Sequence, residues 1–391
     1  MKSLNNYRLP RRILYIIFAI DVAGYIIKNF LGLFKKSSGI NFKEQQFKKI
    51  LLIRLDHAGD MVLLSPVYKL LREKYPFSKI DLLIGPWAKE IVEGNKYIDG
   101  IIEYNAHWFN RDKNKSINIK ETLGLLGKLR KENYDLAIEF RGDIRNILLF
   151  SFAGFRHFIG YSISGLGFLL DKELLFKKTV HQVDLNLALL EFLGVNISCP
   201  QLYIPYSDED KTIVTELAGS LNTGKGNIEK TICIHPGVGR SSGKWPPAYF
   251  SRLSDLLVES GKFNVLLVSG HSKQDRNKIS DILNNSNNSK KIKVIDKKIN
   301  LRQLFGIISN CDFFIGLESG PAHIAAAAGV KGISIFSGIV RGDGFNPWSS
   351  KIKVIRKETS CSPCGKISCD NNTCMTTLLP EEIYKCVLEL I

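Results

Sequence analysis

From residue 48 onward, short apolar runs alternate with stretches of helical period, and the same order restarts near residue 230. Runs of this kind are typical of buried strands in a parallel sheet that is covered by helices. The pattern therefore predicts an α/β protein with two Rossmann-like domains facing a central cleft. The expected strands lie within residues 48–55, 79–85, 97–104 and 134–140, and within residues 230–237, 263–270, 291–296, 311–319 and 331–338.

The chain before residue 48 has a different pattern. Between Arg12 and Lys35 the chain is apolar apart from Asp21, Lys28 and Asn29, and Asp21 and Lys28 share nearly the same face of a helix. The run is longer than a signal-peptide core and no small-residue cleavage site follows it, so removal on export is not expected. Its length allows a transmembrane span, but the two charges near its middle disfavour one. We expect a helix lying in the membrane interface; the alternative is an extra helix packed on the first domain.

These patterns divide the chain into four parts. Residues 1–47 form the basic and apolar segment, and residues 48–200 form the first Rossmann-like domain. Residues 201–229 lie near prolines and an acidic cluster and contain the loop GSLNTGKGN, so we expect a linker region there. Residues 230–391 form the second domain.

The charge balance narrows the list of partners. The chain has 54 Lys and Arg against 38 Asp and Glu, and residues 1–49 hold ten basic and two acidic residues. Such a protein can face nucleic acid, an anionic membrane or a phosphorylated substrate. No basic stretch carries interleaved aromatic residues, so a nucleic-acid partner is not expected. Neither half begins with a full G-x-G-x-x-G motif, so nothing supports a nicotinamide or flavin cofactor.

Three loops that follow predicted strands carry unusual residues. Ligands of such sheets bind outside the carboxyl ends of the strands, so chemistry is expected there. In one loop Pro321 stands where a helix is expected to begin, and Gly320 before it allows close approach to the backbone. The free N–H groups of that helix start predict an anion site. The loops are RLDHAGDMVLLSP (54–66), HPGVGRSSGKWPPAYF (235–250) and GLESGPAHIAAAAG (316–329).

With these motifs the chain resembles the family 9 glycosyltransferases, whose members include ADP-heptose:lipopolysaccharide heptosyltransferases. The resemblance covers residue 48 to the C-terminus. It implies GT-B architecture, a donor held mainly by the second domain, and inverting transfer without a catalytic metal. Its marks are Gly59, Asp60 and Pro66, the His-Pro-Gly to Trp-Pro loop (235–246), and Ser-Gly-Pro-x-His (319–323).

The resemblance assigns Asp60 as the catalytic base that takes the proton from the acceptor hydroxyl. From the residues alone, the alternative is that Asp60 caps the helix that follows. Pro66 is expected either to kink this helix or to delay its start.

The resemblance also implies that loops of the second domain bind the donor diphosphate. Oriented N–H groups and a nearby cation stabilise a departing diphosphate, and either Arg240 or Lys244 can supply the cation. A solvated loop lysine is the alternative for Lys244, and His323 either contacts the phosphates or fills a core position. The chain departs from the family pattern by Glu318 in place of Asp and by Gly243 where the lysine usually stands. The expected donor-binding residues are Gly237, Arg240, Lys244, Glu318, Ser319, Gly320 and His323.

On the acceptor side, Arg141, Asp143 and Arg145 follow a predicted strand of the first domain. Arginine suits bidentate binding of carboxylate or phosphate, so an anionic glycolipid or glycan acceptor is expected at Arg141 and Arg145. Surface salt bridges are the alternative. A lipid-linked acceptor would suit a cytoplasmic enzyme that is held on the inner face of the cytoplasmic membrane by residues 1–47.

Four cysteines have the compact spacing C-x2-C-x4-C-x4-C: Cys361, Cys364, Cys369 and Cys374. This spacing can close a structural zinc site or an iron–sulfur site. Unliganded thiols are the alternative, and disulfides rank behind both. No cofactor is expected to be required for catalysis.

The leading hypothesis is an inverting glycosyltransferase that moves a sugar, heptose by the resemblance, from an ADP-linked donor to a lipopolysaccharide-core or related surface glycan. Two alternatives stay open: a catalytically silent, membrane-associated sugar-nucleotide binder, and another enzyme of the same architecture, such as a nucleotide-sugar epimerase or a glycan phosphorylase. No pyridoxal-phosphate lysine can be identified for the phosphorylase.

Overall fold

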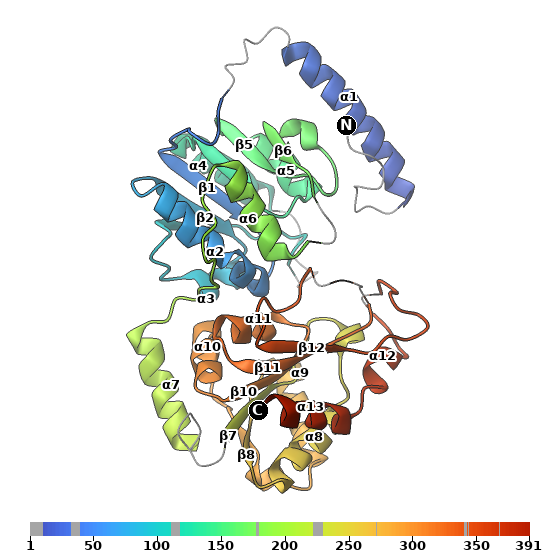
Figure 1. Cartoon of the computed structure of the whole chain (residues 1–391). Coiled ribbons are helices and arrows are strands. Elements are labelled where there is room, and N and C mark those ends of the chain that lie inside the picture. Colours follow the sequence, from blue (N-terminus) through green and yellow to red (C-terminus); the bar gives the residue numbers. More distant parts are fainter. Residues whose placement is uncertain are drawn as a thin grey trace. The chain divides into compact units, whose positions relative to one another are not determined.

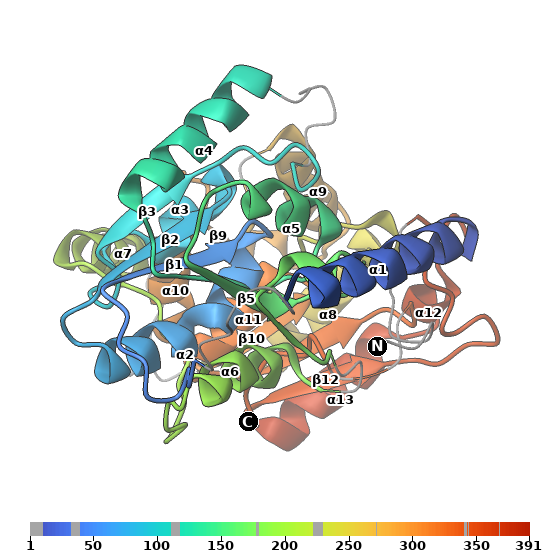
Figure 2. The same ribbon diagram turned by 90° about the horizontal axis from the view of Figure 1, so that it is seen from above.

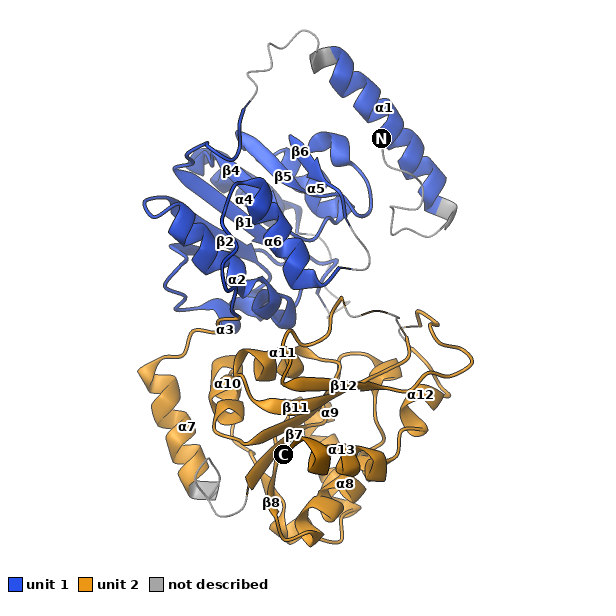
Figure 3. Ribbon diagram, viewed as in Figure 1, with its two compact units in different colours: residues 1–201 blue, residues 202–391 orange. Residues whose placement is uncertain are grey.

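The computed structural model describes residues 11–32, 40–110, 118–176, 180–221, 230–270, 272–339, 342, 344–366 and 368–391. The chain divides into two compact units, Met1–Gln201 and Leu202–Ile391 (Figures 1 and 3). Each unit is built around one parallel sheet of six strands. The two Rossmann-like units predicted from the sequence are therefore confirmed.

The sheet of unit 1 has the strand order β3-β2-β1-β4-β5-β6, and every neighbouring pair is parallel. Its central strands are apolar throughout because helices cover both faces of a parallel sheet. Leu51 and Ile53 of β1, for example, are completely buried and pack with α4 and α5. The strands are β1 (Lys49–Arg54), β2 (Lys79–Ile84), β3 (Gly100–Glu103), β4 (Leu136–Glu139), β5 (His157–Tyr161) and β6 (Lys172–Leu174).

The helices of unit 1 begin and end where the sequence supplies caps. In α4, the Asn118 side chain accepts the N–H of Glu121 (3.2 Å), and the helix ends at Asn133 in the left-handed conformation. The helices are α1 (Arg11–Gly32), α2 (Ala58–Lys74), α3 (Lys89–Val92), α4 (Ile119–Glu132), α5 (Ile144–Ser151) and α6 (Gln182–Phe192), with 3-10 helices η2 (Pro86–Ala88) and η3 (Gly167–Leu169).

The apolar N-terminal helix expected from the sequence is α1, and it contacts unit 1. The backbone N–H of Leu166 donates to Asp21 Oδ1 (2.7 Å), and the Tyr25 ring meets the Phe168 ring edge-on at 6.2 Å between centroids. Figures 1 and 2 both show α1 outside the sheet-and-helix layers of unit 1. One face of α1 therefore packs on the first domain, as the alternative expects. The membrane hypothesis concerns the opposite face.

Unit 2 repeats the plan, with strand order β12-β11-β10-β7-β8-β9 and parallel pairing throughout. Its strands are β7 (Lys230–His235), β8 (Phe263–Leu267), β9 (Lys293–Val294), β10 (Phe313–Leu317), β11 (Lys331–Phe336) and β12 (Ile352–Arg356). Its helices are α7 (Asp208–Leu221), α8 (Pro247–Glu259), α9 (Lys273–Asn284), α10 (Leu301–Ser309), α11 (Gly320–Ala327), α12 (Thr373–Thr376) and α13 (Pro380–Leu390), with 3-10 helices η4 (Ser241–Gly243) and η5 (Ser289–Lys291).

The segment expected as a linker, residues 201–229, contains α7 and belongs to unit 2. An ion pair between Arg302 Nε and Asp210 Oδ2 (2.9 Å) joins α7 to α10. Both side chains are mostly buried, so the pair fixes α7 more firmly than a surface pair would.

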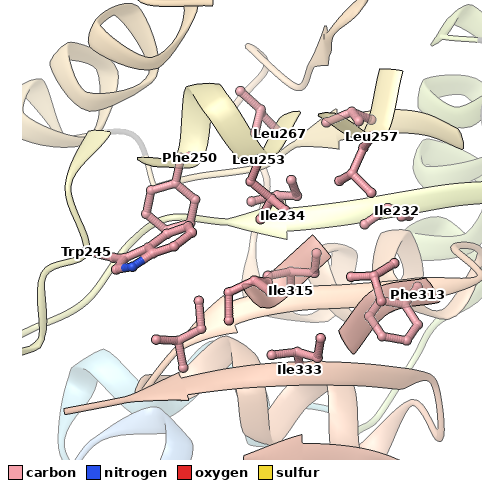
Figure 4. Packing of buried hydrophobic residues seen from close by; sticks show 14 of the residues in the cluster. Ile232, Ile234, Trp245, Phe250, Leu253, Leu257, Leu267, Phe313, Ile315 and Ile333 are labelled. Carbon is pink, nitrogen blue, oxygen red and sulfur yellow. The ribbon is translucent and has the colours of Figure 1, made fainter. Parts of the chain in front are cut away.

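The core of unit 2 joins its sheet to the loop that carries the Trp-Pro motif. Ile234 of β7 and Ile315 of β10 are completely buried in this core (Figure 4). Trp245 lies at its edge, where its ring packs edge-on against Phe250 of α8 at 4.8 Å between centroids. The indole N–H donates to the Leu378 carbonyl (3.0 Å), so its one polar group is satisfied. Trp245 therefore fixes the end of the 236–246 loop to the body of the unit.

Candidate active site

The residues predicted to act lie where the strand order reverses in each sheet. In unit 1, β1 pairs with β2 on one side and with β4 on the other, and the chain runs from β1 towards Asp60 and from β4 towards Arg141. In unit 2, β7 and β10 are neighbours and precede the 236–246 and 318–323 loops. Open parallel sheets bind their ligands at such switch points.

Asp60 lies in the first turn of α2, and both of its carboxylate oxygens are held. Oδ2 accepts the backbone N–H of His57 (3.1 Å), and Oδ1 accepts an N–H of the Arg54 guanidinium (3.3 Å). The bond from His57 is one half of a capping box, so Asp60 does support the helix start. The side chain is still 16% exposed, which leaves the carboxylate accessible to a substrate hydroxyl. The helix begins well before Pro66, so the expected delay of its start is wrong.

The Arg54 side chain orients the Asp60 carboxylate. It is the last residue of β1 and is completely buried. Its guanidinium donates to the Phe140 carbonyl (3.3 Å) and to the Asn186 side-chain oxygen (3.1 Å). A buried arginine held from several sides has one geometry, so Asp60 receives a fixed positive charge.

A second carboxylate, Asp56, completes the group. Asp56 Oδ2 lies 3.2 Å from Arg54 Nη2 and 3.2 Å from Arg141 Nη1. The Asp56 side chain is 3% exposed, whereas that of Arg141 is 38% exposed. Arg141 therefore pairs with a buried carboxylate while part of its side chain reaches the surface, where a substrate can contact it.

The charges give the two aspartates different acidities. Burial alone would raise the pKa of Asp60, but Arg54, Arg141 and the His57 N–H outweigh burial, and the pKa of Asp60 is lowered. For Asp56 burial wins over the same two arginines, and its pKa is raised. The lowered pKa of Asp60 keeps its carboxylate ionised and able to accept a proton at neutral pH.

Glu139, at the end of β4, holds the loop that carries Arg141. It accepts the backbone N–H of Gly142 and the side-chain N–H of Asn146 (2.9 Å). Burial raises the pKa of Glu139 to about 8 despite these two bonds. Gly142 has a φ of +73°, a conformation that favours glycine, so the loop turns sharply here.

Arg145 is placed differently from Arg141. Its guanidinium pairs with Asp143, the N-cap of α5, with Nη2 to Oδ2 at 2.6 Å. The guanidinium also stacks near Trp108 and Phe109, at 5.7 and 5.5 Å from the ring centroids. Arg145 therefore forms the surface salt bridge of the alternative, and half of its side chain remains exposed beside two aromatic rings.

In unit 2, the His-Pro-Gly loop is ordered by His235. This imidazole is buried, and its Nδ1 accepts the backbone N–H of Gly237 (3.2 Å). Burial lowers the pKa of His235 to about 4, so the ring is neutral at physiological pH. A side chain at position 237 would place its Cβ 2.7 Å from His235 Cε1. Gly237 therefore lets the loop fold closely over the histidine.

The Ser-Gly-Pro turn forms the predicted helix start. Ser319 is the N-cap of α11, Gly320 is its first residue and Pro321 its second, one position later than expected. Glu318, Ser319, Gly320 and His323 are all partly exposed at this end of the helix. Helix N-termini favour bound anions.

The two expected cations, Arg240 and Lys244, have different surroundings. Arg240 Nη1 lies 4.0 Å from Glu318 Oε1, so the two loops of the expected donor site meet at the edge of the sheet. Lys244 is exposed, and its backbone carbonyl accepts the Asn372 side-chain N–H (2.7 Å).

Sequence reasoning missed Lys278 of α9, whose ammonium donates to the Pro236 carbonyl (3.3 Å). Burial lowers the pKa of Lys278, and the charge of Lys244 contributes to the same shift.

The four clustered cysteines form no disulfide. Cys361 is exposed, and Cys374 packs against the core of unit 2. Within the described part of the chain, no three His, Cys, Asp or Glu side chains are gathered so as to hold a metal ion. A structural zinc or iron–sulfur site therefore stays a prediction from spacing alone.

The structure thus joins Asp60 and Arg141 in one charged cluster and joins Arg240 to Glu318 in another. Arg54, Asp56 and Glu139 were not singled out from the sequence. Each is a charged residue at or just beyond the end of a buried apolar strand, and that position was the available signal, because a charge is buried only with partners.

Comparisons with known proteins show which chains this one is similar to. The chain is 29% identical over 302 residues to lipopolysaccharide heptosyltransferase 3 of Escherichia coli K12, covering 75% of this chain and 83% of that protein. A family 9 glycosyl transferase structure from Veillonella parvula superposes with a TM-score of 0.75 at 22% identity, over 89% of this chain and 98% of that one. The structure of Escherichia coli ADP-heptose lipopolysaccharide heptosyltransferase II superposes with a TM-score of 0.67 at 22% identity, over 88% and 98%. The fold is therefore GT-B.

The family model described as glycosyltransferase family 9 (heptosyltransferase) matches residues 123–375. This range is more than half of the 391 residues and includes Arg141, the His-Pro-Gly loop and the Ser-Gly-Pro turn. The chain belongs to glycosyltransferase family 9.

Proposed function

We propose that this protein is an inverting heptosyltransferase that transfers a heptose from ADP-heptose to a lipopolysaccharide-core or related surface glycan, with Asp60 as the general base. The observation that carries the proposal is the state of Asp60. Its carboxylate is partly exposed at a switch point, is oriented by Arg54 and the His57 N–H, and has a lowered pKa.

The proposed step is a single displacement. The acceptor hydroxyl oxygen attacks the anomeric carbon of the donor while its proton passes to Asp60. The bond from the anomeric carbon to the diphosphate oxygen breaks, and its electron pair leaves with ADP. Attack from the side opposite the departing group inverts the anomeric configuration. A positioned carboxylate contributes about 10²–10⁴ in rate as general base.

Unit 2 is proposed to bind the donor. The start of α11 at Ser319 and Gly320 presents backbone N–H groups, which favour a diphosphate. Arg240 and Lys244 are cations of the 236–246 loop, and Lys278 of α9 contacts that loop through the Pro236 carbonyl. Such preorganised groups stabilise the charge that develops on the leaving diphosphate. The proposed mechanism uses these side chains in place of a catalytic metal.

Unit 1 is proposed to bind the acceptor. Arg141 is joined to the cluster that holds Asp60 and is partly exposed, so it can pair with an anionic group near the attacking hydroxyl. Trp108 and Phe109 lie beside Arg145 and offer ring faces to a sugar. We place the enzyme at the cytoplasmic face of the inner membrane, where a lipid-linked core acceptor would be accessible to it.

The test combines turnover and binding on the full-length chain. Acceptor-dependent release of ADP from ADP-heptose is measured with lipopolysaccharide extracted from a heptose-deficient strain, and the anomeric configuration of the product is determined by NMR. The variant Asp60→Asn should lower kcat about 10²–10⁴-fold, with little change in the ADP Kd measured by calorimetry.

The matched control is Glu73→Gln, the same chemical change at an exposed position of the same helix, which should leave kcat unchanged. Wild-type turnover that Asp60→Asn does not reduce would contradict the role of Asp60. Nucleotide binding without turnover would favour the silent binder, and preference for UDP or GDP would contradict the ADP-heptose donor.

A further inference from the structure

The polar stripe of α1 faces unit 1. Asp21 is 2% exposed and accepts the backbone N–H of Leu166 (2.7 Å). The Lys28 ammonium donates to the Leu170 carbonyl, and the Tyr25 hydroxyl donates to Glu173 Oε2. These three polar side chains of an otherwise apolar helix are therefore engaged by unit 1.

Glycines on both sides allow this contact to be close. A Cβ at Gly24 of α1 would lie 2.4 Å from the Phe168 ring, and a Cβ at Gly165 would lie 2.3 Å from Ile17 Cγ2. Gly165 also has a φ of +115°, which favours glycine. Side chains at either position would push the helix away, so α1 fits its site closely.

The opposite side of α1 is apolar and exposed. Asp21 and Lys28 are the only charged residues between positions 13 and 30, and both lie on the inward side. This arrangement is the reverse of a surface helix in a water-soluble domain, which exposes its polar face. The outward face consists of Ile13 (46% exposed), Tyr15 (66%), Ile16 (62%), Ile20 (43%), Ile26 (61%) and Ile27 (58%).

The site that holds α1 adjoins the loops of the proposed acceptor side. Leu166 lies in the loop after β5, and in the same loop Ser164 Oγ accepts the N–H of Ile144 (2.8 Å) and donates to the Gly142 carbonyl (3.2 Å). Gly142 and Ile144 lie between Arg141 and Arg145 in the chain. A surface that covered the outward face of α1 would therefore lie on the side of unit 1 that carries these arginines.

We propose that the outward face of α1 docks on an anionic lipid surface, and that the Asp21 and Lys28 contacts hold the helix on unit 1 so that the chain binds one leaflet without crossing it. The occupant is lipid rather than protein because the sequence segment that contains this apolar face, residues 1–49, carries ten basic and two acidic residues, which suits anionic headgroups. A crossing helix would have to place Asp21 and Lys28 in hydrocarbon and lose both contacts with unit 1. The inference is independent of the proposed reaction.

The first test is co-flotation of the full-length chain with vesicles of phosphatidylcholine alone or with added phosphatidylglycerol. We expect flotation with the anionic vesicles, weaker flotation with neutral ones, and a loss of about tenfold or more in the bound fraction for Ile16→Glu with Ile27→Glu. Phe77→Glu adds one glutamate, half of that charge, at a fully exposed apolar residue of unit 1 outside α1 and should float like wild type. ADP binding by calorimetry checks that each variant is folded.

Failure of wild type to float, or equal flotation of the Ile16→Glu, Ile27→Glu variant, would overturn the proposal. So would analytical ultracentrifugation that shows these substitutions dissociating a dimer without reducing flotation, because the face would then bind a second copy.

The second test concerns topology and uses an N-terminally tagged full-length chain in spheroplasts. Protease added outside should leave both the tag and the two units intact, and protease added to inverted vesicles should cleave them. Cleavage of either part in spheroplasts would mean that α1 crosses the membrane. In addition, Asp21→Ala should speed hydrogen exchange at the Leu166 amide about tenfold or more, and unchanged exchange would contradict the contact that holds α1.

Discussion

At the scale of single residues, the chemistry of unit 1 depends on how two arginines divide their charge between two carboxylates. Arg54 reaches both Asp56 and Asp60, whereas Arg141 lies against Asp56. Asp56 is the more deeply buried carboxylate, so its pKa rises while that of Asp60 falls. Asp56 pairs with both arginines, and the ionised carboxylate of Asp60 lies beside them with its side chain partly exposed. Asp56 therefore positions the arginines that lower the pKa of Asp60.

Glu139 should make the stability of unit 1 depend on pH in an unusual direction. Its pKa is about 8 in the folded chain against an ordinary value of 4.5, so between these values the folded state binds a proton that the unfolded state does not. Stability should then fall as pH rises, by about 1.4 kcal/mol per pH unit. The variant Glu139→Gln cannot ionise, so denaturant unfolding from pH 5 to 8 should show a smaller decline than wild type.

The comparison uses slopes because Glu139→Gln also disturbs the bonds to Gly142 and Asn146 and lowers stability at every pH. Glu73→Gln, at an exposed site, should keep the wild-type slope. Equal slopes for wild type and Glu139→Gln would show that Glu139 is ionised in the folded chain.

Sequence motifs predicted Asp60 and the Ser-Gly-Pro turn because both have a local signature. They could not predict the Arg54 and Asp56 pair or Lys278, whose meaning depends on partners from distant segments such as Asn186 and Pro236. The same limit applies to Arg145, because its pairing with Asp143 is visible only once α5 and its cap exist. Residues within a short motif were therefore easier to single out from the sequence than residues whose partners come from distant segments.

At the scale of elements, continuous apolar runs predicted nine of the strands, because buried parallel strands are apolar on both faces. The pattern did not mark β5, β6 or β12. Strand β6 has three residues, and β12 contains Lys353 and Arg356 and lies at the edge of its sheet. Short and edge strands lack the continuous signal and form because a neighbouring strand offers hydrogen bonds.

The His-Pro-Gly loop gives a prediction at this scale. In Gly237→Ala the new Cβ would meet the buried His235 ring at 2.7 Å, so the loop or the ring must shift. We expect a loss of about 1–3 kcal/mol in stability and about tenfold weaker ADP binding. Denaturant unfolding and calorimetry measure the two effects.

The control is Gly124→Ala in α4, where an added Cβ has no neighbour within 4 Å. That change should stabilise the chain by about 1 kcal/mol through helix propensity and leave ADP binding unchanged. Wild-type ADP affinity in Gly237→Ala would remove the 236–246 loop from the proposed donor site.

At the scale of the whole molecule, the two units repeat one plan with different chemistry. Both have six parallel strands and place their charged loops at the strand-order reversal. Unit 1 holds a partly exposed carboxylate and arginines at this point, whereas unit 2 holds a helix start, lysines and an arginine. This difference suits a reaction in which unit 1 activates the acceptor and unit 2 binds the donor diphosphate.

The division can be tested by hydrogen exchange on the full-length chain with and without saturating ADP. A ligand that binds the native state slows exchange in the backbone that it contacts, and at about 100 times its Kd the maximum stabilisation is about 2.7 kcal/mol. Slowing of about tenfold to hundredfold should therefore appear in peptides from residues 235–246 and 318–329 of unit 2. Peptides from residues 54–66 and 139–146 of unit 1 should change little, because the acceptor is absent. Protection confined to unit 1 would reverse the assignment, since the nucleotide would then lie with Asp60, and the start of α11 would need another ligand.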